Sequence, residues 1–158
     1  YYIVHQQAPT TENKDSDTIH PAQIHDHELL WHNGIIKAKE VERLRNELQC
    51  SVTWDTHLLL RYINDYCTPD GIDGTFSCVW YHQGELFMFR NEISPLFIDD
   101  KLNISSTKFD NSTSVPANEI IRIWVGPDEE GNLLKLNKDR LEVEATFTTK
   151  ENPYYFGV

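Results

Sequence analysis

Two short segments of this chain carry residue types that can act on a carbonyl group. His32-Asn33-Gly34 follows an apolar run, and Asp55 stands just before the periodic residues of a later helix. An Asn-Gly pair in a tight turn between strand and helix presents an amide donor and backbone N–H groups, which can hold negative charge on a carbonyl oxygen. The Asp55 carboxylate can pair with a substrate ammonium. The simpler alternatives are an ordinary Asn-Gly turn and an ordinary helix N-cap.

No nucleophile stands in a recognisable motif. The sequence lacks GxSxG, and Cys50, Cys67 and Cys78 have neither a glycine-rich elbow nor a CxxC partner. GxGxxG and the P-loop are also absent, so we expect no nucleotide and no other cofactor. Asn33 and Asp55 therefore predict one half of a catalytic pocket whose nucleophile is not in this sequence.

A metal site is the alternative use of the early histidines. His25-Asp26-His27 has a spacing of two, so on a strand both imidazoles would face the same side. Two histidines and a carboxylate can bind zinc or iron. No third ligand has a diagnostic spacing and HExxH is absent, so we predict no metal, and a metal assay would decide this alternative.

Composition limits the class of protein. The chain has 158 residues and a formal net charge of −11, from 25 acidic and 14 basic residues. We expect one domain over residues 1–158 and no binding to nucleic acid, whose phosphates such a surface repels. No apolar run reaches membrane-spanning length, so no membrane partner is expected. Three cysteines without paired spacing fit a reducing compartment, so the sequence favours a cytoplasmic protein.

The periodicity predicts two helices in the first half and mostly strands afterwards, which indicates an α+β fold with helices over sheet faces. The helices are expected at 38–49 and 55–66, where apolar residues recur at helical spacing. Polar loops are expected at 9–19 and 108–118. Strands are expected at 1–4, 28–31, 75–81, 85–90, 96–98, 103–105, 119–124, 133–136 and 141–145.

The order of these motifs resembles the glutaminase domain of class II glutamine amidotransferases, which are N-terminal-nucleophile hydrolases. The similarity covers roughly residues 1–125. Each motif alone is weak, and their shared order and spacing carry the resemblance. The matching segments are His5-Gln6-Gln7-Ala8-Pro9-Thr10, His20-Pro21, His32-Asn33-Gly34, Trp54-Asp55-Thr56-His57, Gly74-Thr75-Phe76-Ser77, Arg90-Asn91, Ser94-Pro95-Leu96 and Ile104-Ser105-Ser106.

The resemblance implies a four-layer αββα sandwich with mainly antiparallel sheets, incomplete at its N-terminus. It implies hydrolysis of glutamine or a related amide through a thioester on an N-terminal Cys, with that residue's own α-amine as base. Asn33 and Gly34 would then form the oxyanion hole. Asp55 would hold the α-ammonium, and Gln7, Thr10 and His32 would lie on the substrate side.

Three departures from the family pattern argue against glutamine hydrolysis by this chain alone. The nucleophile is missing, Gln7 replaces the arginine that binds the glutamine carboxylate, and Ser94 and Ser106 replace charged residues. A lost charge-assisted contact weakens substrate binding. We therefore expect activity only in a longer protein or with a second chain that supplies the N-terminal segment. The alternative function is a catalytically inactive, acidic interaction protein on the same scaffold.

Overall fold

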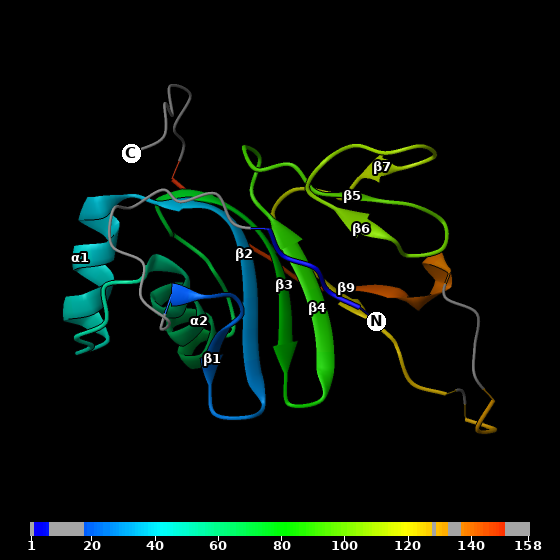
Figure 1. Ribbon diagram of the computed structural model, residues 1–158, viewed down its shortest axis with the longest axis horizontal. Helices are drawn as coiled ribbons and strands as arrows, with labels where there is room; N and C mark the ends of the chain where they lie inside the picture. Colours follow the sequence, from blue (N-terminus) through cyan, green and yellow to red (C-terminus); the bar gives the residue numbers. More distant parts are fainter. Residues whose placement is uncertain (1, 7–17, 128, 133–136, 151–158) are drawn as a thin grey trace.

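The computed structural model describes residues 2–6, 18–127, 129–132 and 137–150. It confirms an α+β architecture with two α-helices and mainly antiparallel sheets (Figure 1). None of the described helices is both long and apolar enough to cross a membrane. The helices are α1 (Ala38–Glu47) and α2 (Asp55–Tyr66), and a short 3-10 helix spans Lys138–Arg140.

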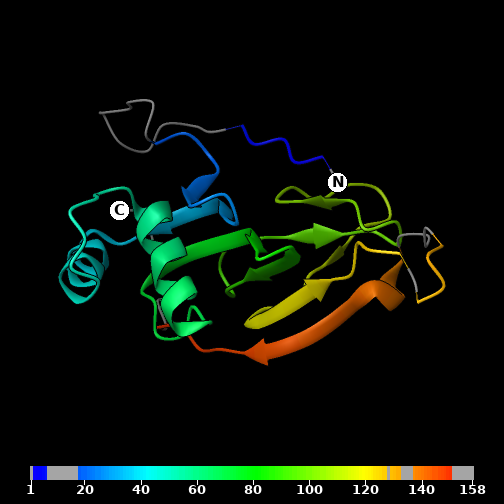
Figure 2. The same cartoon turned by 90° about the horizontal axis from the view of Figure 1, so that it is seen from below.

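The larger sheet has six strands in the order β1-β2-β3-β4-β8-β9, so that β1 and β9 form its edges (Figure 2). Neighbouring strands all pair antiparallel. A smaller sheet has the order β6-β5-β7. The strands of the larger sheet are β1 (Ala22–Ile24), β2 (Glu28–Ile36), β3 (Gly74–His82), β4 (Glu85–Arg90), β8 (Glu119–Ile123) and β9 (Leu141–Thr146), and those of the smaller are β5 (Phe97–Ile98), β6 (Ile104–Ser105) and β7 (Thr113–Ser114).

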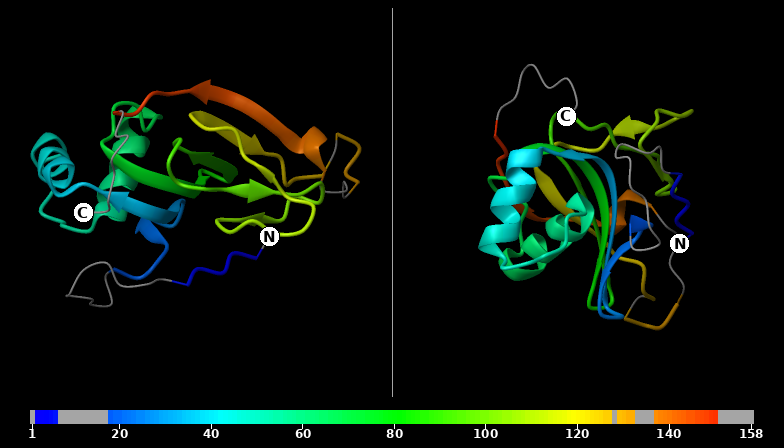
Figure 3. Two further views of the ribbon diagram at one scale, coloured as in Figure 1. Left: turned by 90° about the horizontal axis from the view of Figure 1, so that it is seen from above. Right: turned by 60° about the vertical axis from the view of Figure 1, so that its left-hand side comes forward.

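The larger sheet has a hydrophobic core on each face. Both helices cover one face and the smaller sheet covers the other (Figure 3). Leu30, Leu59 and Phe76 belong to the core under the helices, whereas Met88 and Leu102 belong to the core under the smaller sheet. Because side chains alternate between the two faces of a strand, one strand serves both cores. The described residues thus form three layers, and the complete αββα sandwich stays a prediction.

Several local predictions hold and others are wrong. The helix at 55–66 and the strand at 85–90 have the predicted bounds. Residues 2–4 form no strand, although their types favour one, and the predicted strand at 133–136 lies outside the described residues. The predicted loop at 108–118 contains β7, and β1 was not predicted at all. Strand propensity alone did not decide these segments, because pairing depends on partners distant in sequence.

Arg90 ties the larger sheet to the segments beside β5 and β7, and Asn91 ties the end of β4 to β3. The Arg90 guanidinium donates to the carbonyl oxygens of Val115 (2.6 Å), Asn91 (3.0 Å) and Ser94 (3.5 Å). Asn91 is buried, and its amide donates to the Gly74 carbonyl at 2.8 Å. Partial burial lowers the pKa of Arg90 below its usual value, but the group keeps its charge.

We predict that Arg90→Met lowers the free energy of unfolding by about 2–3 kcal/mol, because it leaves these carbonyls without their charged donor. Urea unfolding followed by circular dichroism measures this change. The matched control is Lys108→Met at an exposed position, for which we expect a change within about 0.5 kcal/mol. Equal stabilities of the two variants would show that Arg90 does not connect the sheets.

Candidate functional site

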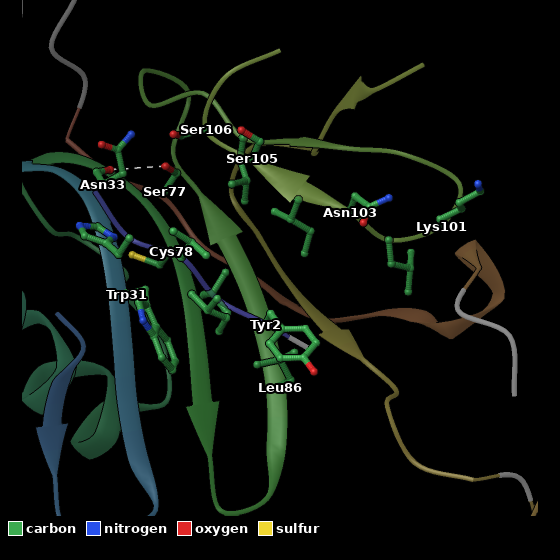
Figure 4. Close-up of a pocket in the computed structure, with 17 residues that line it drawn as sticks. Tyr2, Trp31, Asn33, Ser77, Cys78, Leu86, Lys101, Asn103, Ser105 and Ser106 are labelled. Atoms are coloured by element: carbon green, nitrogen blue, oxygen red, sulfur yellow. Dashed lines mark hydrogen bonds between the residues drawn. The ribbon is translucent and has the colours of Figure 1, made fainter. Parts of the chain in front are cut away.

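A pocket of about 540 Å³ lies between the larger and the smaller sheet. Strands β2, β3 and β4 supply one wall, the smaller sheet and the loop before β6 supply another, and residues 2–5 run across the same space (Figure 4). Asn33, Ser77, Ser105 and Ser106 gather at one end, and Tyr2 and Leu86 lie toward another. The pocket therefore combines a polar end with apolar walls, as ligand sites commonly do.

Asn33 presents a free amide to this pocket. It pairs with Ser77 across β2 and β3, and directly opposite residues of antiparallel strands face the same side. The Ser77 hydroxyl donates to the Asn33 backbone carbonyl at 3.4 Å. The Asn33 side chain is exposed and makes no hydrogen bond with the described residues. Its NH₂ group is therefore available to a ligand oxygen.

Position 34 has no room for a side chain and accommodates only glycine. Its φ is +145°, and a Cβ added there would lie 2.0 Å from the Thr75 carbonyl oxygen. The prediction of a tight strand-to-helix turn at Asn33-Gly34 is wrong, because β2 continues to Ile36 and α1 begins at Ala38. The glycine instead permits a close approach of two backbones inside a sheet.

Side chains bind the backbone N–H groups that follow Gly34. The Thr75 hydroxyl accepts from the Ile35 N–H at 3.0 Å, and the Asp55 carboxylate accepts from the Ile36 N–H at 3.1 Å. These two bonds tie the end of β2 to β3 and to the first turn of α2. They fix the position of the backbone next to Asn33.

Asp55 lies outside the pocket. It is the first residue of α2, which packs on the helix-covered face, and it is not among the pocket-lining residues. One carboxylate oxygen accepts from Ile36 and the other from the Thr56 N–H at 2.8 Å. A carboxylate has about four acceptor positions, so Asp55 can accept further hydrogen bonds. Ammonium binding by Asp55 stays a prediction.

His32 is buried on the helix-covered face, where it contacts β3 and α2. Its Nε2 lies 3.2 Å from the Thr75 carbonyl oxygen, and its Nδ1 lies 3.0 Å from the Thr56 hydroxyl. A carbonyl only accepts, so Nε2 carries the proton, and in the neutral ring Nδ1 accepts from Thr56. His32 does not line the pocket, and its predicted contact with substrate stays a prediction.

Two further histidines extend this network to the pocket. His20 Nε2 lies 3.3 Å from the Thr56 hydroxyl, and the His20 ring stacks on His5 with centroids 3.9 Å apart. His5 lines the pocket. Nothing in the sequence indicated that Thr56 joins His32 and His20, which only the fold shows. The peptide bond between His20 and Pro21 is cis.

The histidines considered for a metal site do not share a strand face. His25 has a φ of 57° in the turn between β1 and β2, and His27 lies in the same turn. Within the described part of the chain, no group of three or more His, Cys, Asp or Glu residues is arranged to hold a metal ion. Gln7 and Thr10, both predicted to lie on the substrate side, fall outside the described residues.

Cys78 is the one cysteine among the described residues that lines the pocket. Its side chain packs into the helix-covered core on the same face of the sheet as His32 and is 1% exposed. Burial, with a smaller effect from the Asp55 charge, raises the pKa of the thiol well above its usual value. The thiolate, not the thiol, attacks carbonyl groups, so the raised pKa disfavours Cys78 as a nucleophile.

Comparison with known proteins adds no relative. The sequence matches no model of a known protein family, and no curated protein matches it. The resemblance to glutamine amidotransferases therefore depends on the sequence motifs alone.

We predict that Gly34→Ala lowers the free energy of unfolding by about 2–4 kcal/mol, since the methyl group collides with the Thr75 backbone. Thermal and urea unfolding measure the effect. Gly126→Ala is the control, because a Cβ at Gly126 meets nothing within 4 Å. Similar stability of both variants would contradict the close approach at Gly34.

A second prediction concerns the buried hydroxyl of Thr56. Thr56→Val keeps the shape but leaves His32 Nδ1 without its donor, and we expect a loss of about 1–3 kcal/mol in unfolding free energy. Thr56→Ser keeps the hydroxyl and should lose less. Long-range ¹H–¹⁵N NMR spectra of the imidazoles should show the Nε2–H tautomer for His32. An Nδ1–H tautomer, or equal stability of the Val and Ser variants, would refute the network.

Proposed function

We propose that this chain is the amide-hydrolysing domain of a class II glutamine amidotransferase-like enzyme. The substrate is glutamine or a related side-chain amide. The nucleophile is an N-terminal Cys that belongs to polypeptide beyond these 158 residues, either in the same protein or in a second chain.

The observation that carries this proposal is the free amide of Asn33 at the polar end of a pocket between two sheets. Ser77 stands beside it, and Ser105 and Ser106 lie near it from the smaller sheet (Figure 4). An amide N–H₂ fixed on a strand can stabilise an oxyanion without reorganising during the reaction. The side chains that tie Ile35 and Ile36 support this role, because they fix the backbone next to Asn33.

The proposed reaction has two steps. The thiolate attacks the amide carbon, the carbonyl oxygen becomes negative, and the Asn33 amide at the pocket holds that charge, with the Gly34 N–H as the second donor that the family resemblance implies. The C–N bond then breaks, the nitrogen takes a proton from the catalytic α-ammonium, and ammonia leaves a thioester. Water, deprotonated by the same amine, attacks the thioester and releases the carboxylic acid and the free thiol.

The decisive experiment compares Asn33→Ala with the unchanged sequence in the complete native protein. We predict that ammonia release falls about 10²–10³-fold in kcat, because one oxyanion donor is lost. A coupled glutamate dehydrogenase assay measures the ammonia.

The control is Asn64→Ala, which removes an amide from α2 outside the pocket and should leave the rate unchanged. Two results would contradict the proposal: no ammonia from any side-chain amide, or an Asn33→Ala rate within threefold of the original. The first result would favour the inactive, acidic interaction protein.

A further inference from the structure

Strand β9 forms an edge of the larger sheet, away from the helices. It is the last strand in the order β1-β2-β3-β4-β8-β9, and two views show it along the outer margin of that sheet (Figures 2 and 3). Four of its six residues are exposed, whereas β3 and β4 inside the sheet are mostly buried. An open sheet edge can accept a further strand, which is a common mode of peptide recognition.

The backbone groups of Val143 point away from β8. The Trp124 N–H donates to the Arg140 carbonyl oxygen at 2.9 Å, so Arg140 turns toward β8. In an antiparallel ladder, backbone groups turn toward the neighbouring strand at every second residue. Glu142 therefore also turns toward β8, and Val143 turns outward. Among the described residues, no segment beyond β9 bonds to the Val143 backbone.

The regular part of this edge is short. The pairing of β9 with β8 shifts register and leaves Glu144 without an opposite residue. The N–H of Leu141 already donates to the Lys138 carbonyl oxygen. The outward groups in regular strand geometry are then the Leu141 carbonyl and both backbone groups of Val143. A docking segment is therefore a few residues long, with one residue directly opposite Val143.

Two carboxylates of β9 belong to an acidic cluster on one face of the sheet. Glu142 accepts from the Trp124 indole N–H at 3.1 Å, and Glu144 pairs with Arg122 at 3.6 Å. The Arg122 guanidinium lies 3.6 Å from the centre of the Trp124 ring and also pairs with Glu85. Three carboxylates thus surround one guanidinium, and this cluster has an excess of two negative charges.

The other cations near the start of β9 have partners of their own. Lys138 pairs with Asp100 at 3.2 Å, and Arg140 donates to the Gly126 carbonyl oxygen at 3.2 Å. The whole chain has a formal net charge of −11. Local charge and net charge both favour a positively charged partner at this edge.

The opposite face of β9 is apolar. Val143 is 53% exposed and lies opposite Ile121, a residue of the core under the smaller sheet. A residue paired directly with Val143 places its side chain on this apolar face. Its two neighbours place theirs on the face of Glu142 and Glu144, because side chains alternate along a strand. The edge therefore matches a segment with the pattern basic–apolar–basic.

We propose that β9 binds an extended segment of a partner protein, in which basic residues flank an apolar one, as an added antiparallel strand. A second copy of this chain fits the edge poorly. Pairing two β9 edges would bring their glutamates together, and like charges opposite each other destabilise a sheet. The proposal is independent of amide hydrolysis at Asn33.

The test is NMR titration of the complete native protein with three capped peptides. The basic probe is Ser-Arg-Val-Arg-Ser, the acidic one is Ser-Glu-Val-Glu-Ser, and the third is the basic probe N-methylated at its valine. We expect the basic probe to shift the Val143 amide resonance. It should bind about tenfold more tightly than the other two, since they lack the positive charge or one backbone donor.

Variants of β9 separate side-chain charge from backbone pairing. The double variant Glu142→Gln with Glu144→Gln should weaken the basic probe about tenfold. The control, Glu42→Gln with Asp65→Asn, removes two exposed carboxylates from α1 and α2 and should leave its Kd within about twofold. Val143→Pro removes the outward N–H and should also weaken binding about tenfold. Thermal melting verifies folding, and the N-methylated probe tests the pairing without changing the protein.

Several results would overturn the proposal. Equal affinity for the basic and acidic probes, or equal losses in the two double variants, would show that β9 does not select a basic segment. Equal affinity for the N-methylated probe would rule out strand addition. A dimer in sedimentation velocity that Val143→Pro dissociates would assign the edge to a second copy instead.

Discussion

The hydrogen bonds from the Ile35 and Ile36 N–H groups to the side chains of Thr75 and Asp55 fix the site. Both bonds form next to Gly34, where β2 lies against the Thr75 carbonyl. The end of β2 is therefore held by both α2 and β3. An Asn-Gly pair on its own would form a flexible turn. Here the same two residues belong to a strand, and Asn33 has a defined direction.

The period-2 alternation of β2 divides the candidate residues between two environments. Asn33 faces the pocket, whereas its neighbour His32 faces the buried network of Thr56 and Thr75. The carboxylate of Asp55 belongs to the second environment. The described pocket lining therefore contains Lys101 and several hydrogen-bond donors but no Asp or Glu.

The sequence predicted the α+β class, the helix at 55–66 and the strand at 85–90, because their periodicity is strong and local. It did not predict that β2 extends to Ile36, since side chains from Asp55 and Thr75 replace the local turn preference. The sequence also did not indicate that the smaller sheet and the loop before β6 form the opposite wall of the pocket. Lys101 lies in a later loop, and no local pattern reveals that it lines the same pocket as Asn33.

The most direct test of the central claim is covalent labelling of the complete native protein with a diazoketone analogue of a side-chain amide, followed by intact mass and peptide mapping. A nucleophile at the pocket should take one label per chain, on a Cys, Ser or Thr at the mature N-terminus. Asn33→Ala should slow that labelling. No label, or a label only on the exposed Cys67, would contradict amide hydrolysis at this pocket.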